Sequence, residues 1–392
     1  MPSLSKLFKL IAFASPIALI TIACQEDLTS VEKFGTTSVS IQETSTKMIQ
    51  DIYDSCTRKE YVQIQYDNAR KMAAPRAEIT IPSSAAMTNP DNPRDSLPAS
   101  PNLASLKPRF NLRSSPYEFP PAKMRFKCLP KRNQAQVMQN MNDVLAIYVA
   151  TLGRLASPNT VTFDQNLKAI GESIKSLNKE VRGSISSPTP EALQTFDNGM
   201  NNGINIATSL LNLFANQQRQ EKLKPIIICS NDNVTKYIDD LQKLIQLFYI
   251  TGVLKEEEDV NLQYIEELYS SYLADTSASK PETKTEVYML LENDYRQRID
   301  GIEARRASAQ AYINILEKTS LTHKALAKTF RGDMAPADQK ILCQNEGYIL
   351  GTSLQQSSLD LTPQQVQKAQ QILSDYEVSI QPSLKVLKKT FR

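Results

Sequence analysis

Glycine, histidine and tryptophan are scarce in this sequence, and the scarcity of the first two excludes whole classes of fold and chemistry. The 392 residues include 11 Gly, one His and no Trp. So few glycines disfavour folds built on tight hairpins or on glycine-rich loops that bind phosphate. A single histidine excludes a three-histidine metal site. It also makes any histidine-based catalysis depend on His323 alone.

The common catalytic and metal-binding motifs are missing as well. The sequence has no phosphate-binding loop, no Gly-x-Ser-x-Gly, no His-Glu-x-x-His and no Glu-x-x-His. His323 has no acidic residue three or four positions away, so we expect it to be a partly exposed polar residue. We therefore predict a protein that is not an enzyme and holds no catalytic residue, metal or cofactor.

Three acidic clusters are candidates for a cation-binding or carboxylate site. The densest is Glu256 to Asp259, whose adjacent carboxylates would point in different directions around a helix. Because this cluster stands near an expected helix start, the helix dipole accounts for it better than a bound cation does. Asp239-Asp240 and Glu266-Glu267 are interpreted in the same way, as solvated helix faces.

The first 23 residues have the form of an export signal. Lys6 and Lys9 precede an apolar run from Leu10 to Ala23, which is too short to span a bilayer core of roughly 30 Å. Pro16 would also weaken a membrane helix there. We expect this segment to direct export and to be removed.

The end of that segment, Thr21-Ile22-Ala23-Cys24, resembles the lipobox of bacterial lipoprotein precursors. The resemblance implies that Cys24 is diacylated and becomes the mature N-terminus, anchored to a membrane. By resemblance to enterobacterial lipoprotein sorting, Gln25 at the next position, where an Asp would retain the protein at the inner membrane, implies the outer membrane. The alternative is ordinary signal cleavage after Ala23, which would give a secreted or soluble periplasmic protein.

The other four cysteines are candidates for disulfides, because an exported chain enters an oxidising space. Three pairings are possible, and we prefer Cys56 with Cys128 and Cys229 with Cys343. The first of these would close an irregular segment and contribute roughly 4 kcal/mol by loop entropy. No Cys-x-x-Cys occurs, so neither a zinc ribbon nor thioredoxin-like chemistry is indicated.

The rest of the chain predicts an all-α fold, a bundle of long, partly kinked antiparallel helices with a Pro-rich irregular insertion near the N-terminus. Ten prolines between Pro75 and Pro121 exclude a continuous helix there. The resulting division is a signal peptide at 1–23, an anchor and first amphipathic helix at 24–62, the Pro-rich basic segment at 63–130 and the helical bundle at 131–392.

Apolar residues at three- and four-residue steps predict the individual helices. Pro225 is expected either to kink one helix or to start the next, and Pro382 to kink the last. Thr362, Pro363 and Gln365 form a capping box at the start of that last helix. The predicted helices cover about residues 30–60, 137–155, 159–183, 188–223, 225–248, 256–273, 281–330, 337–356 and 363–389.

Charge is distributed unevenly along the chain. From Lys255 to Glu303, thirteen acids oppose five bases. From Lys107 to Arg132, by contrast, eight bases oppose one acid, Glu118, and we call this stretch the basic arm. One interpretation is that the basic arm binds an anionic surface, such as lipid headgroups or an envelope polymer. The other is that this arm packs on the protein's own acidic helices. The arm contains Lys107, Arg109, Arg113, Lys123, Arg125, Lys127, Lys131 and Arg132.

These features together predict a lipid-anchored cell-envelope protein that acts as a non-catalytic helical binding or scaffolding module. Its expected partner is an envelope protein or an anionic envelope polymer, and export argues against nucleic acid. One alternative is a membrane-perturbing effector whose hairpins, such as Leu210 to Ile250, insert into a bilayer. A second is a hydrolase that uses carboxylates alone.

Overall fold

The computed structural model describes residues 29–72, 122–156, 223–274, 281–344 and 361–391, together with residues 194, 197–198 and 201. The signal segment, Cys24 and the helix predicted at 159–183 lie outside the described residues. So do most of the Pro-rich segment and most of the helix predicted at 188–223.

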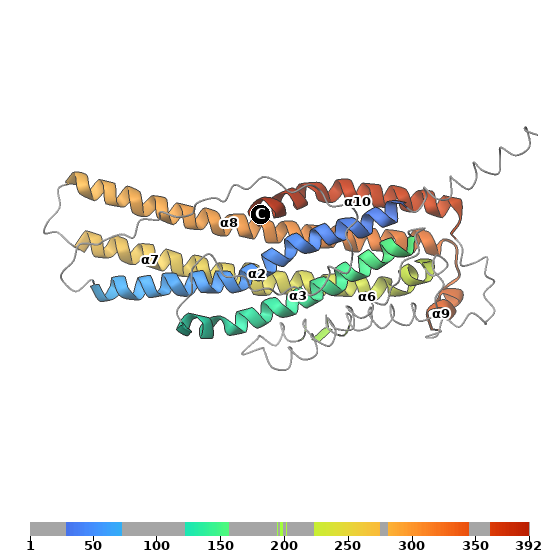
Figure 1. Cartoon of the computed structure of the whole chain (residues 1–392), viewed down its shortest axis with the longest axis horizontal. Coiled ribbons are helices and arrows are strands. Elements are labelled where there is room, and N and C mark those ends of the chain that lie inside the picture. Colours follow the sequence, from blue (N-terminus) through green and yellow to red (C-terminus); the bar gives the residue numbers. More distant parts are fainter. Residues whose placement is uncertain are drawn as a thin grey trace, which may run out of the picture.

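The described residues are almost entirely helical and contain no strand, which confirms the all-α fold. Figure 1 shows an elongated molecule whose long helices lie along one axis. The helices are α2 (Thr29–Met72), α3 (Ala122–Ala156), α6 (Leu223–Leu244), the π-helix η3 (Ile245–Leu254), α7 (Lys255–Ala274), α8 (Pro281–Arg331), α9 (Pro336–Gln344) and α10 (Pro363–Thr390).

Neighbouring helices run in opposite directions along this axis for most of the packed pairs. α2, α10 and the rod formed by α6, η3 and α7 run one way, and α3 and α8 run the other way (Figure 1). The main pairings are α2 with α3, α8 with α10 and α6 with α8. With 44 residues in α2 and 51 in α8, these helices are about 66 and 77 Å long at 1.5 Å per residue.

α6, η3 and α7 form one continuous rod, which corrects the prediction of a separate helix beginning near Glu256. Leu244 and Lys255, the residues that bracket η3, both have right-handed helical dihedral angles, so the backbone does not break at either junction. Pro225 lies in the first turn of α6 and therefore starts the helix rather than kinking one. A Cβ on Gly252 would lie 2.8 Å from the carbonyl oxygen of Leu247, so the wide turn of the π-helix requires glycine there.

Two boundaries in the first part of the chain also differ from the prediction. α2 continues to Met72 because Val62 is buried and Ala69 packs at the far end of the molecule. α3 begins at Ala122, so Pro130 lies inside it. The residues on both sides of Pro130 are held to neighbouring helices, Cys128 by a disulfide and Lys131 by an ion pair, and these contacts offset the lost backbone hydrogen bond.

The last helix begins as predicted. The Thr362 side chain accepts a hydrogen bond from the Gln365 backbone at 3.2 Å, and the Gln365 side chain accepts one from the Thr362 backbone at 3.0 Å. Gln365 Nε2 also donates to the carbonyls of Thr329 and Phe330 at the end of α8. The capping box therefore fixes α10 to α8 as well as starting it.

Most of the apolar side chains form one core along the bundle, and a second, smaller cluster lies at one end. The main core includes the predicted apolar face that runs from Val234 of α6 to Phe248 of η3. At the N-terminal end of α2, Gly35 and Gly153 allow α2 and α3 to touch, since a Cβ on Gly153 would lie 2.9 Å from the Cα of Gly35. The small cluster consists of Ile265, Leu268 and Leu291 with Ala69, Tyr264, Tyr269 and Tyr295 packed against it.

Candidate functional site

Both predicted disulfides are present. Cys56 of α2 is bonded to Cys128 of α3, and Cys229 of α6 is bonded to Cys343 of α9. The Cα atoms lie 5.8 and 5.3 Å apart, within the normal range for a disulfide. Because disulfides form and persist in oxidising compartments outside the cytoplasm, the two bonds assign the chain to such a compartment.

A buried network of charges joins α2, α7 and α8, and its α2 residues flank Cys56 in the sequence. Arg58 donates to Asp51 at 2.8 Å and to Glu257 at 3.0 Å. Arg305 of α8 contacts both oxygens of Glu257, at 2.9 and 3.1 Å, and Asp51 at 3.4 Å. Two guanidinium groups thus neutralise two carboxylates, which is the arrangement that burial of charge requires.

Neutral donors complete this network from α2 and the π-helix. Tyr249 of η3 donates to the second oxygen of Asp51 at 2.7 Å, and Ser55 donates to Glu257 at 2.5 Å. Burial raises the pKa of Asp51 and of Glu257, and the positive charge of Arg58 opposes that rise. For Arg58, burial acts to lower the pKa, but the charges of Asp51 and Glu257 outweigh it and raise it. The network therefore stabilises the ionised form of the arginine.

A shell of more exposed ion pairs surrounds the buried network. Glu256 accepts from Lys59 at 2.9 Å and from Lys131 at 3.2 Å, and Glu60 accepts from Lys127 at 2.8 Å. Glu256 thereby links α2, α3 and α7. The two lysines of the basic arm whose pairs are described contact Glu60 of α2 and Glu256 of α7, of which only Glu256 belongs to the acidic region from Lys255 to Glu303.

The remaining residues of the arm are placed less fully. Arg132 is exposed on α3. Lys123 and Arg125 belong to the first turns of α3, and their side chains are outside the description. Lys107, Arg109 and Arg113 lie outside the described residues.

Two of the acidic clusters each contain a carboxylate that is buried, contrary to the prediction of solvated faces. The carboxylates from Glu256 to Asp259 do point in different directions, but Glu257 is only 3% exposed and not solvated. The helix-dipole explanation is also wrong, because these residues stand in the middle of a continuous rod. Asp239 and Glu266 are exposed as expected, whereas Asp240 is buried.

His323 is buried, which corrects the prediction of a partly exposed side chain. Its Nε2 atom lies 2.6 Å from the hydroxyl of Tyr148, and that hydroxyl lies 2.7 Å from Ser230 Oγ. Its Nδ1 atom lies 3.3 Å from Asn231. Burial lowers the pKa of His323 to about 3, so the ring is neutral at physiological pH and joins α3, α6 and α8 through hydrogen bonds.

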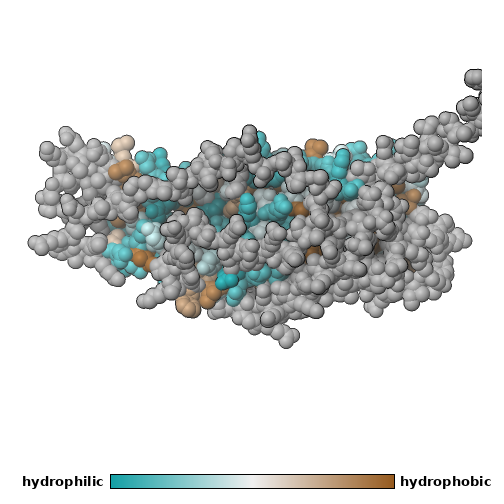
Figure 2. All heavy atoms as spheres, viewed as in Figure 1, coloured by the Kyte–Doolittle hydropathy of each residue, from teal (hydrophilic) through white to brown (hydrophobic). Residues whose placement is uncertain are grey.

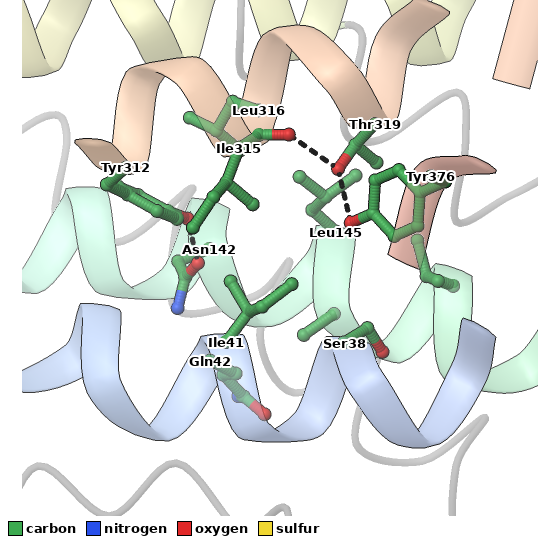
Figure 3. A pocket seen from close by; sticks show the side chains of 12 residues that line it. Ser38, Ile41, Gln42, Asn142, Leu145, Tyr312, Ile315, Leu316, Thr319 and Tyr376 are labelled. Carbon is green, nitrogen blue, oxygen red and sulfur yellow. Dashed lines mark hydrogen bonds between the residues drawn. The ribbon is translucent and has the colours of Figure 1, made fainter. Parts of the chain in front are cut away.

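A third polar group lies between α2 and α3, beside a small cavity. Asp143 accepts from Gln42 at 2.6 Å and from Gln139 at 2.7 Å, and burial raises the pKa of Asp143 to about 6. The cavity has a volume of about 30 Å³, and Figure 3 shows Asn142 and Tyr312 at one end of it and Thr319 and Tyr376 at the other. Its lining contains no carboxylate, so the paired acids of the buried network do not face it.

Neither a metal-binding cluster nor a membrane-spanning helix is present among the described residues. The described residues contain no group of three or more His, Cys, Asp or Glu side chains placed to hold a metal ion. Within the same residues, no helix is both long enough and apolar enough to cross a membrane.

The end of the molecule farthest from the start of α2 exposes apolar side chains. We call it the distal end and define it as residues 61–72 of α2, all of α7 and residues 281–300 of α8. There α7 contacts both α2 and α8, while Thr390, the last residue of α10, donates a hydrogen bond to the carbonyl of Ala304 of α8. Met289 and Leu290 are 62% and 59% exposed, and Tyr61, Ile64 and Leu262 are also exposed. Figure 2 shows apolar spheres at this end among hydrophilic ones.

Sequence reasoning missed the buried charge network and the distal surface. A usable signal was present in α2, where Asp51, Ser55 and Arg58 follow one another at four- and three-residue steps and so share a face. A second polar stripe beside the apolar one indicates a helix that is buried on two sides. Glu257, which Ser55 and Arg58 contact, lies 202 and 199 residues away from them in sequence, so no local pattern in α2 could identify it.

No protein family model, curated protein or solved structure matches this chain.

Proposed function

We propose that this protein is a lipid-anchored component of the bacterial cell envelope that works as a non-catalytic helical binding module. In this proposal the distal end is the binding surface and another envelope protein is the partner. The observation that carries it is the position of the two ends. Cys24 precedes the first residue of α2, Thr29, by five positions. The distal end lies at the other end of α2, at the opposite end of the elongated molecule (Figure 1).

The length of the bundle separates the anchored end from the distal end. α2 spans about 66 Å from Thr29 to Met72, so an acyl chain on Cys24 would hold one end at the membrane and present the other far from it. The Cys56–Cys128 disulfide joins α2 to α3, the buried charge network joins α2 to α7 and α8, and together they keep these helices in register. A rigid spacer of this kind suits contact with a partner better than it suits catalysis.

The surface chemistry of the distal end favours a protein partner. Exposed Met and Leu side chains such as Met289 and Leu290 are typical of contact surfaces, and methionine adapts to differently shaped partners. The lysines described on the arm are already paired with Glu60 and Glu256, which leaves them less available to an anionic polymer.

The anchor is tested by intact mass and membrane fractionation. Wild-type protein should carry a diacylglycerol mass increment on Cys24 and sediment with membranes, whereas Cys24→Ala should lack the increment and become soluble. A wild-type mass that corresponds to simple cleavage after Ala23 would refute the anchor.

The binding surface is tested by site-specific photocrosslinking in intact cells. A crosslinking residue at Met289 or Leu290 should capture one defined envelope protein. Leu321 serves as a matched control, because it is 50% exposed on the same helix but lies away from the distal end. Equal capture from position 321, or capture of lipid alone from position 289, would contradict a protein partner at the distal end.

A further inference from the structure

The two disulfides differ in their surroundings, and the difference points to chemistry at one of them. Cys56 and Cys128 are 4% and 0% exposed, and ion pairs of Lys127 and Lys131 lie beside them. Cys343 is exposed and Cys229 is half-buried. A thiolate from outside therefore has a path to the sulfur of Cys343 that it lacks at the first disulfide.

The exposed disulfide is also the main attachment of α9 to the bundle. Of residues 336–343, only Leu342 is buried, and the helix packs against α6, which carries Cys229. Among the described residues, breaking this bond would leave α9 held chiefly by Leu342, its buried side chain, and by the hydrogen bond that Gln339 accepts from Arg331 at 3.4 Å.

The elements on either side of α9 are fixed independently of that bond. Before it, Gly332 has a φ of +53° and donates to the carbonyl of Lys328 at 3.1 Å, which ends α8 in a defined turn. After it, Gln365 holds the start of α10 to the carbonyls of Thr329 and Phe330. Release of α9 would therefore be local and would leave the packing of α8 with α10 intact.

We propose that Cys229–Cys343 is a thiol–disulfide exchange site for an extracytoplasmic dithiol and that its reduction releases α9 from α6. One thiolate of the dithiol attacks Cys343 Sγ, the bond between the two cysteines breaks, and Cys229 leaves as a thiolate that takes up a proton. The second thiolate of the dithiol then attacks the dithiol's first sulfur, which is bonded to Cys343 in the mixed disulfide, and the bond between that sulfur and Cys343 Sγ breaks. This oxidises the dithiol by two electrons and frees Cys343, which is protonated in turn.

The first test measures which disulfide reacts. The mature full-length protein is treated with increasing dithiothreitol, quenched with iodoacetamide and analysed by peptide mass spectrometry. Cys229 and Cys343 should be alkylated about tenfold or more faster than Cys56 and Cys128, because only the former pair is accessible. Equal rates, or earlier alkylation of Cys56 and Cys128, would overturn the proposal.

The second test measures the release of α9. Lys340 is exposed on α9, and trypsin needs the surrounding helix to open before it cleaves there. Selective reduction should accelerate cleavage after Lys340 while circular dichroism retains the helical signal of the bundle. The double variant Cys229→Ser/Cys343→Ser should be cleaved without reductant, and the matched variant Cys56→Ser/Cys128→Ser should remain protected at Lys340. Protection of Lys340 in the selectively reduced wild type would refute release, even if the matched variant fails to fold.

Discussion

Arg305 of α8 and Glu257 of α7 form a two-point ion pair in the interior of the bundle, with Nη2 2.9 Å from Oε1 and Nη1 3.1 Å from Oε2. Neither residue is near the other in sequence, and Arg58 of α2 contacts the same carboxylate. All three helices therefore meet at Glu257. Without its carboxylate, the two positive charges of Arg58 and Arg305 would be balanced by the single negative charge of Asp51.

Glu257→Gln should therefore lower the free energy of unfolding by about 3–5 kcal/mol, the usual effect of removing one partner of a buried ion pair. Urea unfolding at pH 7 measures it. Glu266→Gln, on the exposed side of the same helix, is the control and should change stability by no more than about 0.5 kcal/mol. The double variant Glu257→Met/Arg305→Met, which restores neutrality, should lose less than the sum of its single changes. If Glu257→Gln and Glu266→Gln lower the free energy of unfolding by the same amount, the buried network does not stabilise the protein as described.

Acid should destabilise the protein through His323. Burial holds the pKa of this ring at about 3, below its ordinary value of 6.5, so the unfolded chain binds more protons than the folded chain between these values. Stability must then fall as pH drops from 6.5, by up to about 1.4 kcal/mol per pH unit. In His323→Gln, the loss of stability between pH 7 and pH 5 should be smaller than in wild type by about 2 kcal/mol. Urea unfolding of both proteins at the two pH values measures this, and identical losses would contradict it.

Asp143 should act in the opposite direction. Burial raises its pKa to about 6 from 3.8, so the folded chain binds more protons in that interval and this contribution to stability is lost as pH rises through 6. Asp143→Asn removes the buried charge. Its amide would also supply a donor for Gln42 Oε1 and Gln139 Oε1, two buried acceptors that receive no hydrogen bond from the described residues.

The Asp143→Asn variant should consequently be more stable than wild type at pH 7, by about 1–3 kcal/mol. The gain should shrink towards zero at pH 4, where the wild-type side chain is protonated in the folded state. Thermal unfolding at both pH values measures it. If the variant is less stable than wild type at pH 7, the ionised carboxylate of Asp143 stabilises the folded protein, and the prediction is wrong.

The contact between α2 and α3 should not accept a methyl group. In Gly153→Ala, the new Cβ would lie 2.9 Å from the Cα of Gly35 and 3.0 Å from the carbonyl oxygen of Val31, so the helices must move apart, at a cost of roughly 1–3 kcal/mol. Gly301→Ala is the matched control, because nothing lies within 4 Å of its Cβ. That change should stabilise the protein by roughly 0.5–1 kcal/mol through helix propensity. Thermal unfolding of both variants measures the difference in sign.

Local chemistry explains what could be predicted from the sequence. The capping box at Thr362 and Gln365 satisfies backbone groups within four residues, so its pattern is complete in the chain itself. The helix from Pro281 to Arg331 was predicted nearly to the residue, because its period and its starting proline are also local. The number of cysteines left three disulfide pairings open, and the preferred one, which is present, was chosen for the irregular segment that Cys56 and Cys128 flank.

The candidate sites depended on contacts that no local pattern contains. The distal surface is exposed because α10 stops near Ala304, a property of how two helices pack. The difference in accessibility between the two disulfides likewise depends on which helices cover them.

The sequence by itself determined that this protein is helical, carries paired cysteines and has a start typical of export, since helix period, capping and residue counts act over a few positions. Only the tertiary structure decided the environment of each charged or polar side chain. Glu257 and His323 were both expected at the surface and are both buried, because burial depends on helices that approach from distant parts of the chain. Desolvation and partner geometry, which set the pKa and the energetic effect of each group, exist only after those helices have packed.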